Sequence, residues 1–440
     1  MSSLTIGLSL FGAMLALMAL RVPISVSMFV PGAVGFWLLG GESALLNHLK
    51  GAAFARFSVY ELSVIPLFIL MGQFATQGGL SRALFQFANA LFGHFRGGMA
   101  MASVVACAMF GAVCGSSIAT AATLGQVALP EMRRFHYSGR LATATLAAGG
   151  TLGILIPPSV PLVVYAILTE QNIAKLFLAA FIPGAIAAVG YCVAIAIYAR
   201  RHPDHAPAQP KHSTAERWHS FIGIWPIFAI FAAVFGGIYG GLFTPTEGAA
   251  VGAAGTFLAA LLRRELGFKA ISRSFFGTAE TTGMIFLIFM GADMLNSALA
   301  LAQTPAQLAE WVATLDVPPL GIAAAILGVY IVLGFFMDEL STVILTIPVI
   351  FPAVMGLDLW GLDYSDKAIW FGILVLMVVE IGLISPPVGL NVYVINSLAP
   401  DVPMSETYRG VVPFLMSDAV RITVLFLFPA ISLWLVWVYG

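Results

Sequence analysis

The chain has 440 residues, of which 60% are hydrophobic and only 9% are charged, and its mean hydropathy is +0.96. A soluble domain of this composition would lack the polar surface needed to cover its core, so the sequence predicts a polytopic membrane protein. A formal net charge of −1 excludes a protein that binds nucleic acids through its charge.

Apolar runs long enough to cross about 30 Å of hydrocarbon recur along the chain. The first run has Arg21 after it and no Lys or Arg before it, the reverse of a cleavable signal peptide. Residues 1–21 are therefore predicted to be a retained span whose N-terminus lies outside. The runs begin near Leu4, Val22, Leu62, Leu141, Leu176, Phe221, Thr244, Thr281, Ala368 and Arg421.

The longest polar stretch divides the chain into two halves. Residues 200–219 are basic and have the composition of a flexible connector, which places them in the cytoplasm. With the apolar run that follows, they form a linker at 200–243. The basic loop around Arg133 lies two spans earlier, as this orientation requires. The halves are a first repeat at 22–199 and a second repeat at 244–440.

Two apolar stretches are too long for one crossing and too short for two. The first, at about 98–131, has basic flanks and a polar centre at Gly115–Ser117, which predicts a hairpin that enters from the cytoplasm. The second, at about 320–355, turns near Phe336–Glu339 and has acidic residues at its mouths. This second hairpin is predicted to enter from outside.

Each hairpin is followed by an apolar segment that contains a pair of prolines. The pair is Pro157–Pro158 in the segment at 141–168, and Pro386–Pro387 in the segment at 368–397. Such a pair cannot continue a helix, because each ring removes an N–H donor and clashes with the preceding turn. At mid-depth the freed backbone groups survive only where they face protein or a wet cavity. Paired broken helices in corresponding halves therefore indicate a transport site.

The two halves also match residue by residue. Residues 65–72 resemble residues 284–291, and residues 116–130 align with residues 338–352. Since one hairpin enters from each side, the predicted fold is an all-α polytopic membrane protein with two inverted-topology repeats, each with a re-entrant hairpin and a proline-broken helix. Four mixed segments are predicted to be interfacial helices, near 42–60, 80–97, 263–280 and 302–315.

Hydroxyl groups and carbonyls at the hairpin tips and helix breaks form oxygen-only ligand sets, which suit hard cations such as Na⁺. For either site alone, packing of hydroxyls between helices is the alternative. No catalytic residue, organic cofactor or metal other than Na⁺ is predicted. The first Na⁺ site would use Ser116, Ser117, Thr120, Thr151, Gly153 and Pro157, and the second would use Asp338, Ser341, Thr342, Gly382, Ser385 and Pro386. The candidate substrate-binding residues are Gly115, Ser116, Ser159, Glu339, Pro387 and Asn391.

Carboxylates inside a membrane are costly and invite a functional interpretation. Glu380 lies within a turn of the second break, where it is either a cation ligand or proton acceptor, or a neutral hydrogen-bonded carboxyl. Glu247 lies in the first turn of its helix, which favours a capping role. Asp293 has no assigned role. Neither broken segment contains Lys or Arg, so an anionic substrate would be held by half-helix N-termini, hydroxyls and bound cations.

Four motifs resemble those of one family of carriers. The motifs are residues 65–72, 115–120, 153–159 and 243–247. In these the chain is similar to the large membrane subunit of tripartite ATP-independent periplasmic (TRAP) transporters, of the dicarboxylate and sialic acid permease type. Ser385 stands where the family usually has Thr, and Glu380 stands where a neutral residue is expected, which leaves open whether protons take part in coupling.

The resemblance implies an elevator-type, Na⁺-coupled secondary carrier in the bacterial inner membrane. Its implied partners are a small membrane subunit and a periplasmic substrate-binding protein, which delivers an organic acid such as a C4-dicarboxylate, a sugar acid or sialic acid. An intramembrane hydrolase is disfavoured, because Ser116 and Ser117 have no His or Lys at similar depth. The alternative that stays open is a stand-alone Na⁺- or H⁺-coupled carboxylate carrier without a binding protein.

Overall fold

The structure, a computed structural model, describes residues 3–314 and 316–440. Every regular element within those ranges is a helix, which confirms the predicted all-α fold class. Among the described helices, five are long and apolar enough to cross a membrane, or up to seven if each of two bent pairs counts as one span. In chain order the helices are α1 (Ser3–Ala19), α2 (Ile24–Gly40), α3 (Glu42–Phe57), α4 (Val64–Gln77), α5 (Leu80–Phe92), α6 (Gly98–Cys114), α7 (Ser117–Arg134), α8 (Gly139–Leu155), α9 (Val160–Thr169), α10 (Ile173–Arg201), α11 (Thr214–Tyr239), α12 (Pro245–Leu262), α13 (Phe268–Leu301), α14 (Thr304–Ala313), α15 (Pro319–Gly334), α16 (Glu339–Met355), α17 (Tyr364–Ile384), α18 (Leu390–Leu398), α19 (Met404–Leu427) and α20 (Ala430–Tyr439), with short 3-10 helices at Tyr60–Ser63 and Pro203–His205.

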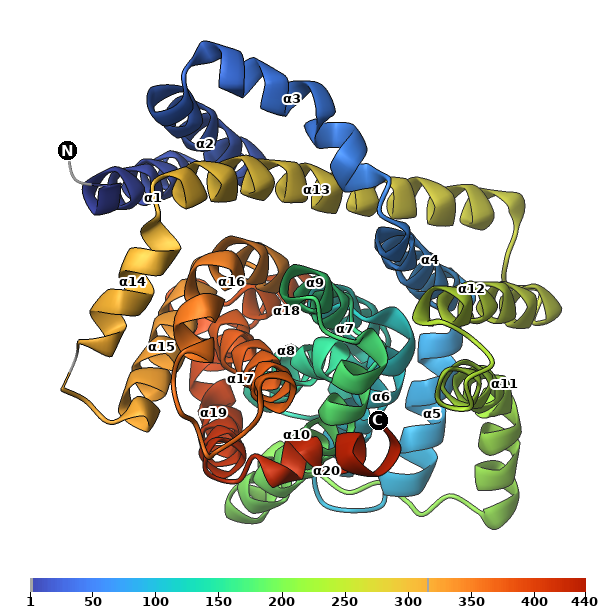
Figure 1. Ribbon diagram of the computed structural model, residues 1–440. Helices are drawn as coiled ribbons and strands as arrows, with labels where there is room; N and C mark the ends of the chain where they lie inside the picture. The colour runs from blue at the N-terminus through green and yellow to red at the C-terminus, as the bar shows by residue number, and fades with distance from the viewer. Residues whose placement is uncertain (1–2, 315) are drawn as a thin grey trace.

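The helices form a central body and a frame along one side of it (Figure 1). The body contains α6–α10 from the first half of the chain and α15–α20 from the second half. The frame is built on α13, which packs along α2 and also contacts α4 and α14. α5 packs on both α6 and α11, and so joins the body to the rest of the frame.

Short turns end the first arm of each hairpin. α6 ends at Cys114 because Gly115 has a positive φ of 66°, and Ser116 then caps α7. α15 ends at Gly334, and Asp338 caps α16 by accepting a hydrogen bond from the Ser341 N–H. The two arms of each hairpin pack against each other.

The proline pairs interrupt helices in both halves. α8 ends at Leu155, and α9 begins at Val160 with its axis turned by 40°. α17 ends at Ile384, and α18 begins at Leu390. The Pro157–Pro158 and Pro386–Pro387 peptide bonds are both cis.

The hairpins and broken helices of the two halves exchange contacts. α7 packs against α18, and α16 packs against α9. Within each half, two glycines let the hairpin approach the broken helix closely. A Cβ on Gly111 would lie 2.6 Å from Gly153 Cα, and a Cβ on Gly382 would lie 2.2 Å from the carbonyl carbon of Gly334. This reciprocal packing brings both tips and both breaks into the middle of the body.

Two spans differ from their predicted bounds. The interfacial segment expected at 263–280 and the span expected from Thr281 are parts of one helix of 34 residues, α13. No proline interrupts α13. The corresponding elements of the first half, α3 and α4, are separate helices with a bend of 55° between them. The span expected to begin near Arg421 is instead made of the last two turns of α19, which ends at Leu427, and of α20, which begins after Pro429. Arg421 therefore lies well inside a helix.

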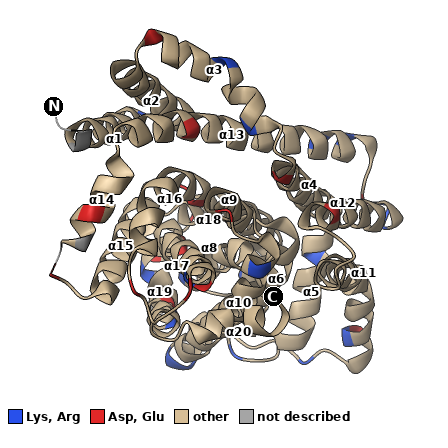
Figure 2. Ribbon diagram, in the orientation of Figure 1, with Lys and Arg blue, Asp and Glu red and all other residues tan. Residues whose placement is uncertain are grey.

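The body buries its centre much more completely than its rim. In α17, 94% of the most apolar window is buried, compared with 39% in α10 and 33% in α19. Most of the ribbon in Figure 2 carries no charge, and the charged residues lie mainly near helix ends. α17 is thus the central helix of the body, and any charge that faces it is removed from solvent.

Candidate functional site

The first hairpin tip contains an unused hydroxyl beside a backbone carbonyl. Thr120 Oγ1 is buried and has no hydrogen-bond partner among the described residues. A Cβ on Gly153 would lie 2.4 Å from Thr120 Oγ1 and 2.6 Å from the Ser116 carbonyl oxygen. The Ser116 hydroxyl accepts a hydrogen bond from the Ala119 N–H at 3.4 Å. Thr120 Oγ1 and the Ser116 carbonyl oxygen thus lie close together against the backbone of Gly153, where α8 offers no side chain.

Two other residues predicted for the first cation site face different partners. Ser117 Oγ accepts a hydrogen bond from Asn391 Nδ2 at 2.7 Å, which ties the first tip to α18 of the second half. Thr151 Oγ1 donates to the Ala148 carbonyl at 2.7 Å and lies 3.2 Å from the Tyr191 hydroxyl. Thr151 and Gly153 are about 200° apart around α8. The structure therefore places Thr151 on the side of α8 that faces α10, away from the tip.

The first break contributes backbone groups close to the tip. A Cβ on Gly115 would lie 3.0 Å from the Pro158 carbonyl oxygen, so the turn of the hairpin touches the break next to Pro157. Ser159 is buried and caps α9, because its Oγ accepts a hydrogen bond from the Leu162 N–H at 3.4 Å. Tip and break thus meet, but the Ser159 hydroxyl is committed to its own helix.

The second tip has a carboxylate where the first has a serine. Asp338 Oδ2 accepts from the Ser341 N–H at 3.2 Å, and the Asp338 carbonyl accepts from Thr342 Oγ1 at 2.9 Å. The Ser341 hydroxyl and Glu339 Oε2 are buried, and neither has a hydrogen-bond partner in the described ranges. This tip therefore also holds unused oxygen atoms, and it is the more acidic of the two.

The second break is linked to α17 and α19. The Ser385 N–H donates to the Gly382 carbonyl at 3.3 Å, immediately before the cis bond that Pro386 forms with Pro387. The Pro387 carbonyl lies 3.4 Å from the Tyr408 hydroxyl of α19. The break residues are thus held from the α19 side, whereas Gly382 is the residue that touches the hairpin.

A cavity of about 110 Å³ lies where the two tips meet the frame. Three predicted substrate-binding residues, Gly115, Ser116 and Glu339, line it. Ser159, Pro387 and Asn391 are not among its lining residues. Ligand pockets are typically about 300–1,000 Å³. A cavity of this size, as it stands, accommodates only a small molecule or part of a larger one.

Sequence reasoning missed the frame side of this cavity. Gln73 and Thr76 of α4 and Thr281 of α13 supply its polar wall. Gln73 and Thr281 are half-buried, and Thr76 Oγ1 donates to the Gly72 carbonyl at 2.9 Å. The signal available was the position of these polar residues beside the repeated motifs, because Gln73 and Thr76 follow the motif at 65–72 and Thr281 precedes the motif at 284–291.

A cluster of buried charges lies behind the second break. Arg421 Nη2 is 3.3 Å from Glu380 Oε2 and 3.0 Å from Asp418 Oδ1. The Tyr191 hydroxyl donates to Asp418 Oδ2 at 2.9 Å and also lies beside Thr151. All five side chains are at most 3% exposed. The cluster links α8, α10, α19 and α17 through the centre of the body.

This cluster answers part of the question about Glu380. Its carboxyl accepts a hydrogen bond from, and is ion-paired with, a guanidinium of α19, a helix outside the broken segments. Asp418 and Arg421 were not predicted as functional residues, although opposite charges three positions apart inside an apolar helix are a recognised signal. The apolar run that begins at Arg421 predicts the start of a span there, so the sequence pattern does not place Arg421 and Asp418 in the same helix.

The two remaining membrane carboxylates have structural partners. Glu247 and Thr244 form a reciprocal capping box at the start of α12, which confirms the predicted capping role. Asp293 of α13 forms an ion pair with Arg56 of α3, and both side chains are partly exposed. Asp293 therefore fastens two frame helices to each other.

Comparison with known proteins agrees with this arrangement. Residues 11–431 match the family model described as the tripartite ATP-independent periplasmic transporter, DctM component. The match covers nearly the whole chain. The chain belongs to the TRAP transporter large-permease family. It is a transporter subunit and not an enzyme.

Curated relatives of this large permease align with it over almost their full length. It is similar to the C4-dicarboxylate TRAP transporter large permease protein of Pseudomonas aeruginosa, with 36% identity over 92% of this chain and 93% of that protein. The corresponding C4-dicarboxylate protein of Vibrio cholerae is 32% identical over 98% and 95%. A sialic acid TRAP transporter large permease of Vibrio cholerae is 28% identical over 97% of each chain.

One solved structure has a similar fold. The Alcanivorax borkumensis YdaH transporter, whose crystal structure was described as having an unusual topology, superposes with a TM-score of 0.63. The superposition covers 90% of each chain at 13% sequence identity. This TRAP large permease thus has the overall fold of a solved membrane transporter.

Proposed function

We propose that this TRAP large permease is the membrane carrier subunit of a Na⁺-coupled system that imports a small organic acid, supplied by a periplasmic binding protein, across the bacterial inner membrane. The observation that carries the proposal is the pair of tips. Each tip has a buried hydroxyl without a partner in the described part of the chain, Thr120 in the first and Ser341 in the second. Each lies where its hairpin contacts a broken helix.

Two Na⁺ ions, one at each tip, would satisfy these oxygen atoms. The first would bind the Ser116 carbonyl and Thr120 Oγ1, beside Gly153. The second would bind Ser341 Oγ together with the carboxylate of Asp338. Hydroxyl, carbonyl and carboxylate oxygens are the ligands that a hard cation prefers. As cargo rather than fixed cofactors, the ions would leave with the substrate, which couples uptake to the Na⁺ gradient.

The cavity between the tips is the proposed substrate site. Its volume of about 110 Å³ and the 36% identical C4-dicarboxylate relative both support a short dicarboxylate over a larger sugar acid. Glu339 lines the cavity and would repel a dianion. Bound cations at the tips would offset that repulsion, so acid and Na⁺ would bind together. The N-terminus of α7 and the hydroxyls of Ser116 and Thr76 would hold the carboxylates.

An elevator movement follows from where the cavity lies. Its walls come half from the body and half from the frame, through α4 and α13. Sliding the body along the frame would carry both tips, with ions and acid, from one side of the membrane to the other. The small membrane subunit would then extend the frame, and the binding protein would dock outside.

The opposite orientation of the hairpins has a separate test. Cys114 would first be replaced, and single cysteines would be placed at Ser116 and Glu339. If the repeats are inverted, small thiol reagents should label the cysteine at position 116 from the cytoplasmic side and the cysteine at position 339 from outside, in at least one carrier state. Labelling of both from the same side alone would sink the inverted arrangement.

Uptake by proteoliposomes tests the function. Vesicles containing the large permease and its small subunit would receive a Na⁺ gradient, the binding protein and radiolabelled succinate, each omitted in turn. Uptake should require all three. The alternative is a stand-alone H⁺-coupled carrier, in which Glu339 in the cavity would accept the proton. Uptake of free acid that is driven by a pH gradient in the absence of Na⁺ would favour this alternative.

A further inference from the structure

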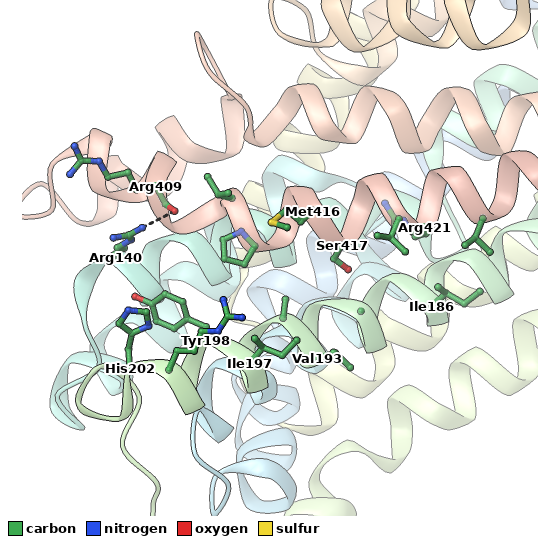
Figure 3. A pocket seen from close by; sticks show the side chains of 17 residues that line it. Arg140, Ile186, Val193, Ile197, Tyr198, His202, Arg409, Met416, Ser417 and Arg421 are labelled. Carbon is green, nitrogen blue, oxygen red and sulfur yellow. Dashed lines mark hydrogen bonds between the residues drawn. The ribbon is translucent and has the colours of Figure 1, made fainter. Parts of the chain in front are cut away.

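An apolar groove of about 700 Å³ runs along the surface of the body between α10 and α19 (Figure 3). Its floor is narrow because the helices approach closely, and a Cβ on Gly190 would lie 2.5 Å from Ser417 Oγ. Its walls carry large apolar side chains that protrude from the protein, including Val193, Met416 and Val420, which are 52%, 67% and 65% exposed. In a membrane these surfaces face lipid.

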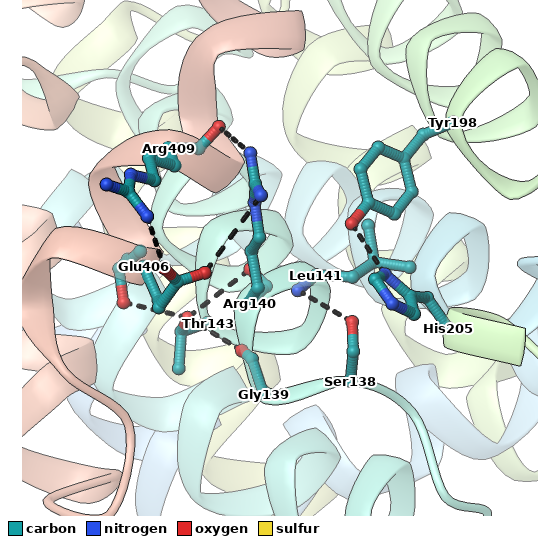
Figure 4. Close-up of polar contacts among 10 residues, drawn as sticks. Ser138, Gly139, Arg140, Leu141, Thr143, Tyr198, His205, Glu406 and Arg409 are labelled. Carbon is teal, nitrogen blue, oxygen red and sulfur yellow. Dashed lines mark hydrogen bonds and ion pairs between the residues drawn. The ribbon is translucent and has the colours of Figure 1, made fainter. Parts of the chain in front are cut away.

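One end of the groove is basic. Arg140, Arg201, His202 and Arg409 line it there. Figure 4 shows Arg140 and Arg409 on either side of Glu406. Arg409 Nη1 is 2.9 Å from the Glu406 carboxylate, and Arg140 Nη1 is 4.0 Å from it. Glu406 thus contacts two of the three guanidinium groups that line this end, and with Arg201 added the end is positively charged.

Two of these groups still have donors to offer. Arg140 Nε is buried without a hydrogen-bond partner in the described ranges, although Arg140 Nη2 donates to the Arg409 carbonyl at 3.0 Å. The Arg201 guanidinium has no ion-pair partner within residues 3–314 and 316–440. An anion at the end of the groove would pair with Arg201 and add a counter-charge beside Arg140.

The groove is longer than the hydrocarbon of one leaflet. From Arg409 to Val424 along α19 is about 22 Å at 1.5 Å per residue, and one leaflet of hydrocarbon is about 15 Å thick, so an acyl chain fits along the groove with room for a headgroup at its basic end. We infer that the groove between α10 and α19 binds one anionic phospholipid, with an acyl chain along the apolar floor and the phosphate between Arg140, Arg201 and Arg409. The inference depends on the membrane location of the chain, not on the transport mechanism.

The occupant follows from the combination of the two parts. A soluble anion would use the arginines but leave the apolar floor empty, whereas a neutral lipid would fill the floor but leave the arginines without a counter-ion. An anionic phospholipid uses both. Each arginine near the membrane surface should favour an anionic over a zwitterionic headgroup about fivefold. Bound lipid would also cover the outer side of Arg421, which lines the inner part of the groove.

Native mass spectrometry of the purified transporter tests this inference. The protein, stripped of lipid by detergent, would be titrated with phosphatidylglycerol or with phosphatidylcholine of the same acyl chains. One phosphatidylglycerol should bind with a clear preference over phosphatidylcholine. Replacing Arg201→Gln and Arg409→Gln together should reduce that preference about 25-fold. The matched control, Arg264→Gln with Lys269→Gln, changes exposed basic residues away from the groove and should have no effect.

A second variant tests the apolar part and does not depend on the arginines. Ala194→Phe fills the groove and should abolish binding of both lipids, whereas Ala232→Phe on an exposed face of α11 should not. Variants count only if they elute as a single species at the wild-type position. Equal binding of the two lipids, retention of lipid by Ala194→Phe, or a dimer in which a cysteine at Val193 cross-links between copies would each overturn the inference.

Discussion

The buried pair of Glu380 and Arg421 should be strongly coupled in stability. The two groups are 3.3 Å apart and at most 3% exposed. At an effective dielectric constant of 20, two unit charges at that distance attract by about 5 kcal/mol. Replacing Arg421 leaves Glu380 and Asp418 in the interior without a counter-ion, which costs on the order of 3–5 kcal/mol, whereas replacing Glu380 leaves Arg421 paired with Asp418.

A double-mutant cycle measures this coupling. Glu380→Gln and Arg421→Gln would be made singly and together, and the free energy of unfolding would be followed in mixed micelles as SDS increases. We expect Arg421→Gln to lose about 3–5 kcal/mol, Glu380→Gln to lose less because Arg421 keeps Asp418, and the double variant to lose less than the sum of the two. The coupling energy should therefore be on the order of 3 kcal/mol.

The chain provides a matched control in an exposed pair. Arg133 and Asp401 form an ion pair at the surface, where the Arg133 side chain is 44% exposed and the Asp401 side chain is 64% exposed. Exposed pairs contribute about 0.2–1 kcal/mol. The cycle with Arg133→Gln and Asp401→Asn should thus give a coupling energy several times smaller. Equal coupling energies for the two pairs would refute the argument that burial makes the Glu380 pair strong.

Two further predictions concern the tips and their packing. Thr120→Ala and Ser341→Ala should each raise the Na⁺ concentration for half-maximal uptake by roughly tenfold, since each removes one oxygen ligand of a charged group; an unchanged Na⁺ curve in both would place the cations elsewhere. Gly382→Ala should destabilise the protein by about 1–3 kcal/mol in SDS titration, because its Cβ would lie 2.2 Å from the Gly334 backbone. Gly283→Ala, with nothing within 4 Å of its Cβ, should be neutral or stabilising, and equal losses would contradict the packing argument.

The features that were readable from sequence are those fixed by local chemistry. A proline pair breaks a helix wherever it occurs, so the ends of α8 and α17 follow from Pro157–Pro158 and Pro386–Pro387. The turn between α6 and α7 is equally local, because Gly115 adopts a positive φ and Ser116 supplies a cap. The repeated motifs then located the tips within the site.

The features that were missed depend on how distant helices meet. The polar wall formed by Gln73, Thr76 and Thr281 exists only because the frame lies against the tips. The partner of Glu380 is 41 residues away, on a helix whose bounds were misplaced. α13 was divided because its first half is more polar than its second, although no residue in it forces a break. Periodicity and composition do not contain these tertiary distances.

The charge cluster also bears on how the two halves move. Glu380 stands six residues before its proline pair, the same position that Thr151 has in the first half. Thr151 contacts Tyr191, Tyr191 donates to Asp418, and Asp418 shares Arg421 with Glu380. The two broken helices are therefore joined by one continuous chain of short polar contacts.

A shift of α8 relative to α17 would break this chain of contacts at its weakest link, the 3.2 Å contact between the Thr151 and Tyr191 hydroxyls. That link joins two neutral groups and is worth about 0.5–1.5 kcal/mol. Separating Arg421 from Glu380 would instead break a buried ion pair, at a cost on the order of 3–5 kcal/mol. We infer that the cluster holds α17 firmly to α19, whereas α8 is attached to the cluster only by a neutral contact.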